Sequence, residues 1–460
     1  MDRLLDGFVR FFVRWIPDSF VVAILLTLLT FFLAVTVAGE PPLDAVLAWG
    51  DSVWHLLAFT NQITLTLLLG FALANTPAMR ALLVRCAGIV RSPTGGYVVA
   101  CWITGVCSLV SWGLALIASG IASRAIGEHC RRHDIPVHYP LLTASSFSGF
   151  VIWHQGLSSS IGLSVASPGH FLEAQMGLLE MSQTIFSAWN VGLVLAVLLT
   201  LPFVMSRLHP RDPAAVEPMP DPIGGREERT RDGATLEAED ARPAVDTTAV
   251  GTPAERVEDS RLLGAAIVLL GAVYLFQHFF VRERGLSLDV FNLGFLLAGI
   301  ALAGSPIRYM RIIVEGGRVA VPLLLQYPFY AGIAGLMAET GLARMIVEQF
   351  IRFADADTLP LFGFLSGGLL NLFVPSGGGQ WALQGPILIA AALEIGADLP
   401  RTTMSVVLGD QWTNLIHPLT LTPIVLVAQI PLRKIMPYTF AAVLYTGIVF
   451  AIAVAIPVSR

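Results

Sequence analysis

The residues best suited to chemistry form a polar stretch inside a long apolar segment. The stretch reads Pro375, Ser376, Gly377, Gly378, Gly379, Gln380 and Trp381. Proline lacks a backbone donor and glycine favours unwound chain, so the helix should break here. Non-helical backbone at membrane depth survives only where it is buried in protein or lines a water-filled cavity. The hydroxyl, amide and free N–H groups therefore predict a binding site for a small polar ligand.

Two further apolar segments are interrupted by clusters of hydroxyl and amide side chains. One covers residues 143–160 and the other covers residues 409–423. A helix that restarts after a break offers free N–H groups and a partial positive charge, which suits a carboxylate. A single Ser is more often a packing residue, but the clusters as units favour a site. The residues expected to contact a substrate are Ser111, Ser158, Ser159, Ser160, Ser376, Gly377, Gly378, Gly379, Gln380 and Asn414.

Three titratable residues within the broken segments are candidates for ion coupling. Asp410 is the acidic residue nearest the centre of a predicted span, and such carboxylates are costly in a membrane. It could bind a cation, relay a proton or pair with a neighbouring donor. His154 and His417 could donate to a bound carboxylate or take up a proton, or they could simply be satisfied by hydrogen bonds.

Neither broken segment contains Arg or Lys, nor does the stretch after Pro375. A polyanion would need a fixed cation, whereas hydroxyls, amides and helix ends can hold a small monocarboxylate. Nearby aromatic residues would suit a short alkyl tail, namely Phe147, Phe150, Trp153, Phe373, Trp381 and Trp412. The chain has no HExxH, Gly-x-Ser-x-Gly or phosphate-loop motif, and its four cysteines lack metal-ligand spacing. We therefore expect no enzyme activity, no metal or other cofactor and no nucleic-acid partner.

The elements that must position these residues are membrane helices. The chain has 460 residues, of which 55% are hydrophobic and 13% charged, with a mean hydropathy of +0.71. This composition is typical of polytopic membrane proteins. Runs of about 20 apolar residues mark the spans. They cover 20–38, 53–74, 97–122, 140–166, 185–204, 262–281, 286–304, 320–338, 359–395, 402–429 and 438–457.

Composition also divides the chain into four parts. Residues 1–16 mix Arg with apolar residues and predict an interfacial amphipathic helix. A first membrane repeat covers 17–205, and a second covers 262–460 with one extra leading span. Residues 206–261 are polar and nearly free of aromatic residues, so we expect a disordered cytoplasmic linker there.

The two halves resemble each other at an almost constant offset. Residues 74–80, 107–113 and 153–161 align with residues 338–344, 371–377 and 416–424. Basic residues flank segment 97–122 on both sides, so both of its ends should be cytoplasmic. That segment is predicted to be a re-entrant hairpin, and segment 359–395 is predicted to be its counterpart from the opposite face. The expected fold is all-α, an inverted repeat with two re-entrant hairpins and two discontinuous helices.

Three strings resemble the bacterial short-chain fatty acid transporter family of the acetoacetate and butyrate permease type. They are 373–386, 148–158 and 409–414. The resemblance implies a multi-pass permease of the bacterial inner membrane. More remotely, the chain is similar to the ion-transporter superfamily, with alternating access as a secondary active transporter and symport of a proton or sodium ion. The alternatives are a carrier of another small carboxylate or dicarboxylate, an intramembrane enzyme or a passive channel. The expected partners are the substrate, the coupling ion and the lipid bilayer. The sequence leaves the oligomeric state open, with a homodimer as one alternative.

Overall fold

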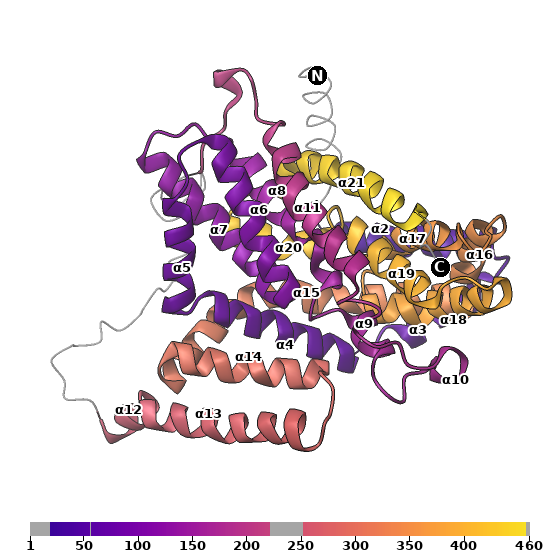
Figure 1. Ribbon diagram of the computed structural model, residues 1–460, viewed down its shortest axis with the longest axis horizontal. Helices are drawn as coiled ribbons and strands as arrows, with labels where there is room; N and C mark the ends of the chain where they lie inside the picture. The colour runs from indigo at the N-terminus through magenta and orange to yellow at the C-terminus, as the bar shows by residue number, and fades with distance from the viewer. Residues whose placement is uncertain (1–18, 56, 221–251, 457–460) are drawn as a thin grey trace.

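The structure is a computed structural model that describes residues 19–55, 57–220 and 252–456. All regular elements within these ranges are helices, which confirms the all-α fold class. The predicted interfacial helix 1–16 lies outside the described residues. Figure 1 labels the helices along the chain.

The first half consists of α2 (Ser19–Thr36), α3 (Pro42–Ser52), α4 (Leu57–Ala74), α5 (Pro77–Gly88), α6 (Pro93–Val110), α7 (Trp112–Arg132), α8 (Tyr139–Ser148), the 3-10 helix η1 (Gly149–Gln155), α9 (Ser160–Val165), α10 (Glu173–Met176) and α11 (Ala188–Ser206). The 3-10 turn η2 (Pro213–Ala215) and α12 (Pro253–Glu258) follow. The second half consists of α13 (Arg261–Phe276), the π turn η3 (Gln277–Val281), α14 (Leu288–Ala303), α15 (Pro306–Glu339), α16 (Leu342–Ile351), α17 (Leu359–Asn371), α18 (Gly377–Ile395), α19 (Leu399–Thr413), α20 (Pro418–Ala428) and α21 (Leu432–Ala455).

Several helices have the length and composition of membrane spans. Five within the described ranges qualify, and a sixth arises if α4 and α5, which bend by 67°, form one span. Other predicted spans are divided into shorter helices. The break at 414–417, for example, separates α19 from α20. The helical chain is therefore a multi-pass membrane protein whose central spans are interrupted.

Each half contains a pair of helices that meet at a short break. α6 and α7 pack against each other and meet at Ser111, whose extended backbone (φ −154°, ψ 128°) ends one helix and whose hydroxyl caps the next. α17 and α18 are separated by residues 372–376. Three side-chain bonds join this second pair, from Gln380 to the Gly367 carbonyl and from Gln384 to the Gly363 carbonyl and the Ser366 hydroxyl, each 3.0 Å long. Both predicted hairpin positions are thus occupied by packed helix pairs.

The order of elements in the first half recurs in the second. A helix and a shorter helix (α4 and α5) precede the α6–α7 pair, and α15 and α16 precede the α17–α18 pair in the same way. A broken segment and a final long helix then follow each pair. This order agrees with two repeats, and their inverted relation stays a prediction. The sequence analysis did not predict α3, α5 or α16.

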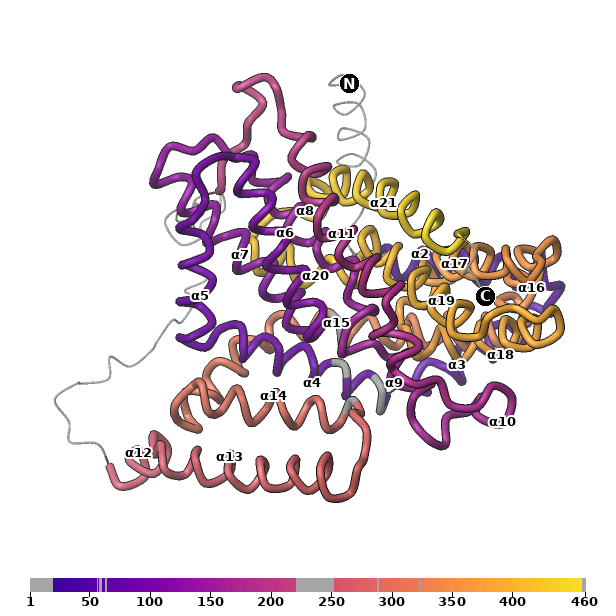
Figure 2. The backbone as a smooth tube through the Cα atoms, in the orientation of Figure 1, coloured from indigo at the N-terminus to yellow at the C-terminus, as the bar shows by residue number. Residues whose placement is uncertain are grey.

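Helix α7 lies at the centre, between α4 and α20. Two glycines allow these close contacts. A Cβ atom on Gly113 would lie 2.6 Å from the carbonyl oxygen of Thr66 in α4, and one on Gly120 would lie 2.6 Å from Cβ of Val427 in α20. Figures 1 and 2 show α13 and α14 at the edge beside α4, with α16–α19 gathered at the end opposite α5. The broken segments therefore lie inside the bundle.

The described start of the predicted linker packs against the bundle. The backbone N–H of Tyr139 donates to the Glu217 carbonyl (2.8 Å), and Glu217 forms an ion pair with Lys434 in α21. Tyr97 and His209 are joined through the Tyr hydroxyl and Nδ1 of the imidazole (2.7 Å), and Met219 is buried. Composition predicted disorder over 206–261, and it could not indicate these contacts because each partner lies in a distant helix.

Candidate functional site

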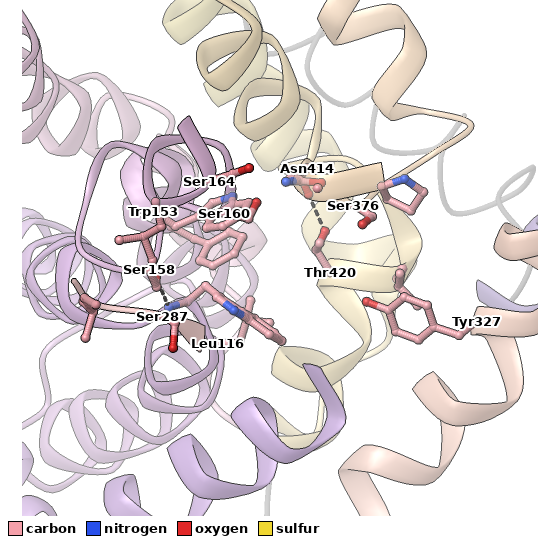
Figure 3. A pocket seen from close by; sticks show the side chains of 18 of the residues that line it. Leu116, Trp153, Ser158, Ser160, Ser164, Ser287, Tyr327, Ser376, Asn414 and Thr420 are labelled. Atoms are coloured by element: carbon pink, nitrogen blue, oxygen red, sulfur yellow. Dashed lines mark hydrogen bonds between the residues drawn. The ribbon is translucent and has the colours of Figure 1, made fainter. Parts of the chain in front are cut away.

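A cavity of about 350 Å³ lies where the two helix-pair breaks and the two broken segments meet. Its polar lining comes from Ser158, Ser160, Ser164, Ser167, Ser287, Tyr327, Ser376, Asn414 and Thr420. Its apolar lining comes from Trp112, Leu116, Phe150, Trp153, Leu163, Leu286, Pro375 and Leu419, together with Gly377 and Gly378. In Figure 3, Trp153, Ser158 and Ser160 face Ser376, Asn414 and Thr420 across the opening. Both halves of the chain therefore contribute to one site.

The first broken segment presents a stack of rings. In a 3-10 helix, residues i and i+3 are eclipsed. In η1 this geometry places Phe150 and Trp153 over one another, and Phe147 at the end of α8 extends the stack, with ring centroids 5.6 Å (Phe147–Phe150) and 5.9 Å (Phe150–Trp153) apart. His154 stacks on Trp153 at 4.2 Å with an interplanar angle of 7°. The stack forms an apolar wall and fixes the orientation of the His154 ring.

The tip of the second helix pair closes on that histidine. Ser376 has extended backbone and caps α18, because its hydroxyl accepts from the Gly379 N–H. The next residue, Gly377, fits against the first half with no room for a side chain. An added Cβ would lie 2.4 Å from both Cε1 of His154 and Oγ of Ser160. The first N–H groups of a helix have no partner within the helix, so the α18 terminus offers donors to the cavity.

Asp410, His154 and Ser160 form a linear chain of polar groups. Oδ2 of Asp410 lies 2.8 Å from Nδ1 of His154, and Oγ of Ser160 lies 3.1 Å from Nε2. The Ile161 N–H also donates to Nε2 (3.2 Å), so Nε2 is an acceptor and the ring proton lies on Nδ1. Asp410 and His154 are fully buried, and Oδ1 of Asp410 has no hydrogen bond among the described residues. Of these three residues, only Ser160 lines the cavity.

Two buried glutamines hold the Asp410–His154–Ser160 group in place. The His154 backbone N–H donates to the Gln411 carbonyl oxygen of the side chain (3.1 Å), and Gln411 donates to Gln155 (2.8 Å). Gln155 in turn donates to Asn190 of α11 (2.7 Å). All four side chains are buried. These bonds tie η1 to α19 and α11 around the Asp410 carboxylate.

His417 occupies a different environment. It caps α20, because its Nδ1 accepts from the Leu419 N–H (3.2 Å), and its Nε2 has no hydrogen bond among the described residues. It is buried and does not line the cavity. Asn414, three residues earlier, does line it and accepts from Asn371 (3.0 Å). The structure thus separates the two predicted coupling histidines.

Four other predicted site residues support the site without lining it. Ser111 caps α7 and Ser159 caps α9, each through its hydroxyl. Gly379 donates to Ser376, and Gln380 holds α18 against α17. Of the ten predicted substrate contacts, the cavity is lined by Ser158, Ser160, Ser376, Gly377, Gly378 and Asn414.

Tyr327 is the main lining residue that the sequence analysis did not identify. It lies in α15 beside Pro328, and α15 also contains Pro322. Figure 3 shows Tyr327 on the same side of the cavity as Ser376. A polar stretch of Gln326 and Tyr327 next to a proline in an apolar span was the available signal. Trp112 was not among the expected contacts either, although it directly follows Ser111, which was.

The cavity combines a largely apolar wall with several polar groups and has no fixed positive charge in its described lining. Its lining residues include no Arg or Lys in the described part of the chain. Within the same ranges, no three His, Cys, Asp or Glu side chains gather in a way that could hold a metal ion. The available recognition groups are hydroxyls, an amide and the amino end of α18. Such groups can hydrogen-bond a carboxylate while the ring stack contacts an alkyl chain.

Comparisons with known proteins agree on a transporter. Residues 1–456 match the family model described as short chain fatty acid transporter. Two relatives named for short-chain fatty acid transport come from Escherichia coli K12 (35% identical, covering 98% of this chain and 99% of the relative) and Haemophilus influenzae Rd (33% identical, covering 98% of each). The crystal structure of the Alcanivorax borkumensis YdaH transporter is similar in fold, with a TM-score of 0.50, 13% identity and coverage of 95% of this chain and 98% of that one.

These names are transporter names, in agreement with the expectation that the chain is not an enzyme. The order Asp410, His154, Ser160 matches that of a serine hydrolase relay. In a serine hydrolase, the second ring nitrogen accepts the proton of the serine. Here Nε2 of His154 already accepts the Ile161 N–H, and the names of the related proteins are those of transporters. The family match over nearly the whole length and two relatives above 30% identity lead to one conclusion: this chain belongs to the short-chain fatty acid transporter family.

Proposed function

We propose that this protein is a secondary active transporter of the bacterial inner membrane that moves short-chain fatty acids such as acetoacetate or butyrate by alternating access. The observation that carries the proposal is the cavity shared by both halves, which has hydroxyl, amide and helix-end donors and no Arg or Lys in its described lining. A monocarboxylate fits this donor set, and a volume of about 350 Å³ accommodates a four-carbon acid.

The carboxylate is placed at the amino end of α18. The Ser376 hydroxyl and the N–H groups of Gly377 and Gly378 converge there, opposite Ser160. A helix amino end stabilises an anion through its free donors and its dipole. The alkyl end then lies against Phe150 and Trp153. Because Ser376 and Ser160 come from different halves, relative movement of the halves would open and close the site.

The coupling ion is a proton in this proposal. With Nε2 of His154 acting as an acceptor, the imidazole is neutral and the adjacent Asp410 carboxylate has no cationic partner among the described residues. A buried, uncompensated negative charge is costly, and protonation of His154 would neutralise it. A proton arriving at Nε2 of His154 would displace the Ile161 N–H and neutralise this charge, so an anion plus a proton would cross together as symport.

Counterflow of labelled butyrate in proteoliposomes tests the transport itself. Unlabelled internal butyrate should stimulate uptake of external labelled butyrate, and a proton gradient should drive accumulation while a sodium gradient should not. Saturation with stimulation from the opposite side distinguishes a carrier from a channel. Absence of saturable uptake under either gradient would refute the proposal.

Ser376→Ala and Ser92→Ala form a matched pair for the binding site. Both hydroxyls cap a helix, α18 and α6 respectively, but only Ser376 lines the cavity. Each variant loses a cap of about 1 kcal/mol, so the stability cost is comparable. We expect the KM for butyrate to rise several-fold in Ser376→Ala and to stay unchanged in Ser92→Ala. An equal KM in the two variants would argue against carboxylate binding at Ser376.

A further inference from the structure

A second cavity, of about 640 Å³, lies on the side of the bundle predicted to face the cytoplasm. The charged and amide residues in its lining are Asn75, Arg80, Arg124, Glu128, Glu315, Arg318 and Gln429. Apolar side chains such as Phe71, Ile121 and Met219 complete the wall. Its three guanidinium groups set it apart from the first cavity, whose described lining carries none.

The two cavities follow the same two helices. Along α7, Leu116 lines the first cavity and Ile121 lines the second. Along α20, Thr420 lines the first and Leu426 the second. Five or six residues of helix correspond to a rise of about 8–9 Å. The cavities are therefore consecutive compartments along one helix pair.

The two helices are in close contact beside the second cavity. Gly120 of α7 packs on Val427 of α20 so tightly that an added Cβ would lie 2.6 Å from Cβ of Val427, and Val427 itself lines the second cavity. Gly120 lies between Leu116 and Ile121 in sequence, so this contact is at the end of the second cavity that is nearer the first.

The second cavity has a free positive group. Arg124 is half-buried and has neither a hydrogen bond nor an ion pair in the described part of the chain. Glu128, the nearest acid along α7, is already paired with Arg131 (2.7 Å) and lies 3.5 Å from Arg132. Arg80 donates to the Asn75 side chain (2.7 Å) and to no carboxylate among the residues that the structure describes. Positive groups in a recess attract and concentrate small anions.

We propose that this second cavity, on the side of the bundle predicted to face the cytoplasm, is a docking site for the carboxylate anion of the transported acid. This inference rests on the proposed function, because it takes the transported carboxylate as the ligand. Arg124 holds the anion electrostatically. Arg80 and Arg318 add to the field and Glu128 and Glu315 oppose it, so the three Arg and two Glu leave the lining with a net charge of +1. The ligand leaves the positive field when it passes into the uncharged first cavity, so the docking site concentrates the anion and the first cavity selects it.

Thiol modification at Ile121→Cys measures the field without requiring transport. The four native cysteines are replaced, and the cytoplasmic face is exposed to sulfonate-bearing or trimethylammonium-bearing methanethiosulfonate reagents. We expect the ratio of sulfonate to trimethylammonium rates to fall about tenfold in Arg124→Gln. Arg85→Gln, an exposed residue of α5 outside the cavity, should leave the ratio unchanged. Equal ratios in both variants would overturn the proposal.

Protection by ligand identifies the occupant. Butyrate should slow modification of Ile121→Cys, the neutral amide butyramide should not, and protection should be lost in Arg124→Gln. Protection by anionic phosphatidylglycerol in the liposomes, without protection by butyrate, would mean a lipid headgroup site and would refute the inference. Protection by butyrate in a protein that shows no counterflow would refute the proposed transport but keep the docking site. The two failures are therefore distinguishable.

Discussion

The sequence alignment of the two halves places His154 opposite His417, yet the surroundings of the two residues differ. His154 is bonded on both ring nitrogens, to Asp410 on one side and to Ser160 and the Ile161 N–H on the other. His417 uses Nδ1 to cap α20 and leaves Nε2 without a hydrogen bond among the described residues. One histidine connects a buried carboxylate to the cavity, and the other completes a helix end.

The difference shows that the two halves use their histidines for different purposes. A broken helix needs a residue that satisfies the free N–H groups at its restart, and His417 serves that need in the second half. In the first half Ser159 caps the restarting helix α9. His154 is therefore free to contact Asp410 from the opposite half. The predicted symmetry of the histidines therefore does not extend to their contacts, and we expect only His154 to affect coupling.

The largest expected effect is from Asp410→Asn. The substitution keeps the shape but removes the charge that a protonated His154 would balance. We expect uptake driven by a proton gradient to fall by about a hundredfold, equivalent to ~2.7 kcal/mol. Exchange of labelled for unlabelled butyrate without a gradient should decline much less. Initial rates in proteoliposomes measure both, and an equal loss of the two activities would show that Asp410 is structural.

Gly377→Ala tests the contact between the halves at His154. Its Cβ would lie 2.4 Å from His154 and Ser160, so the α18 tip must move away. Overpacking of this kind costs about 1–3 kcal/mol, and we expect uptake to fall about tenfold or more. Gly192→Ala in α11 is the matched control, because no atom lies within 4 Å of its added Cβ. Similar uptake rates in the two variants would show that the contact between Gly377 and His154 does not matter for transport.

A third histidine, His138, lies outside the predicted membrane spans and provides a further comparison with His154. His138 precedes α8, accepts from the Glu217 N–H at Nδ1 (2.9 Å) and has Nε2 3.0 Å from the Tyr438 hydroxyl. Burial lowers the pKa of His138 to about 4, and His209 and Lys434 also lower it, while Glu217 opposes the shift. Unlike His154, it has no carboxylate bonded to its ring.

The sign of the pH effect follows from that lowered pKa. The neutral ring is favoured in the folded state, so its stabilisation is complete above the unfolded pKa of about 6.5 and is lost as the pH falls towards about 4. We expect residues 207–220 to become sensitive to proteolysis across that window, and His138→Gln to remove most of the pH dependence. The same pH profile in His138→Gln would assign the change to another group.

The smallest effect is expected at His417. Replacement by Asn retains a good helix cap, and replacement by Ala loses about 1 kcal/mol of stability. Thermal unfolding should therefore distinguish His417→Ala from His417→Asn by a few degrees. Proton-driven uptake by His417→Asn should remain within about twofold of the unmodified protein, or ~0.4 kcal/mol. A loss comparable with that of Asp410→Asn would restore a shared coupling role for both histidines.

The fold was predictable where the signals are local. The predicted segment 359–395 coincides with the start of α17 and the end of α18, because Pro360 lies in the first turn and Gly396 takes the left-handed conformation at the end. Helix α5 was missed despite its cap Thr76 and Pro77, because its Arg residues were assigned to a cytoplasmic loop.

The site was predictable only in part. Clusters of Ser, Gly and Asn indicated the breaks, and six of the ten expected contacts line the cavity. The pairing of His154 with Asp410 spans 256 positions and leaves no local pattern in the sequence. Tyr327 enters the cavity from α15 for the same reason, since tertiary packing determines which face of an apolar helix meets the site.

The stacking of Trp153 on His154 has a spectroscopic consequence. A cationic imidazole quenches the fluorescence of an indole in contact with it more strongly than a neutral one does. Because the two rings lie 4.2 Å apart and nearly parallel, the emission of Trp153 would report the charge on His154 directly. With the other tryptophans replaced by phenylalanine, the protein becomes its own indicator of each proton that is bound and released during transport.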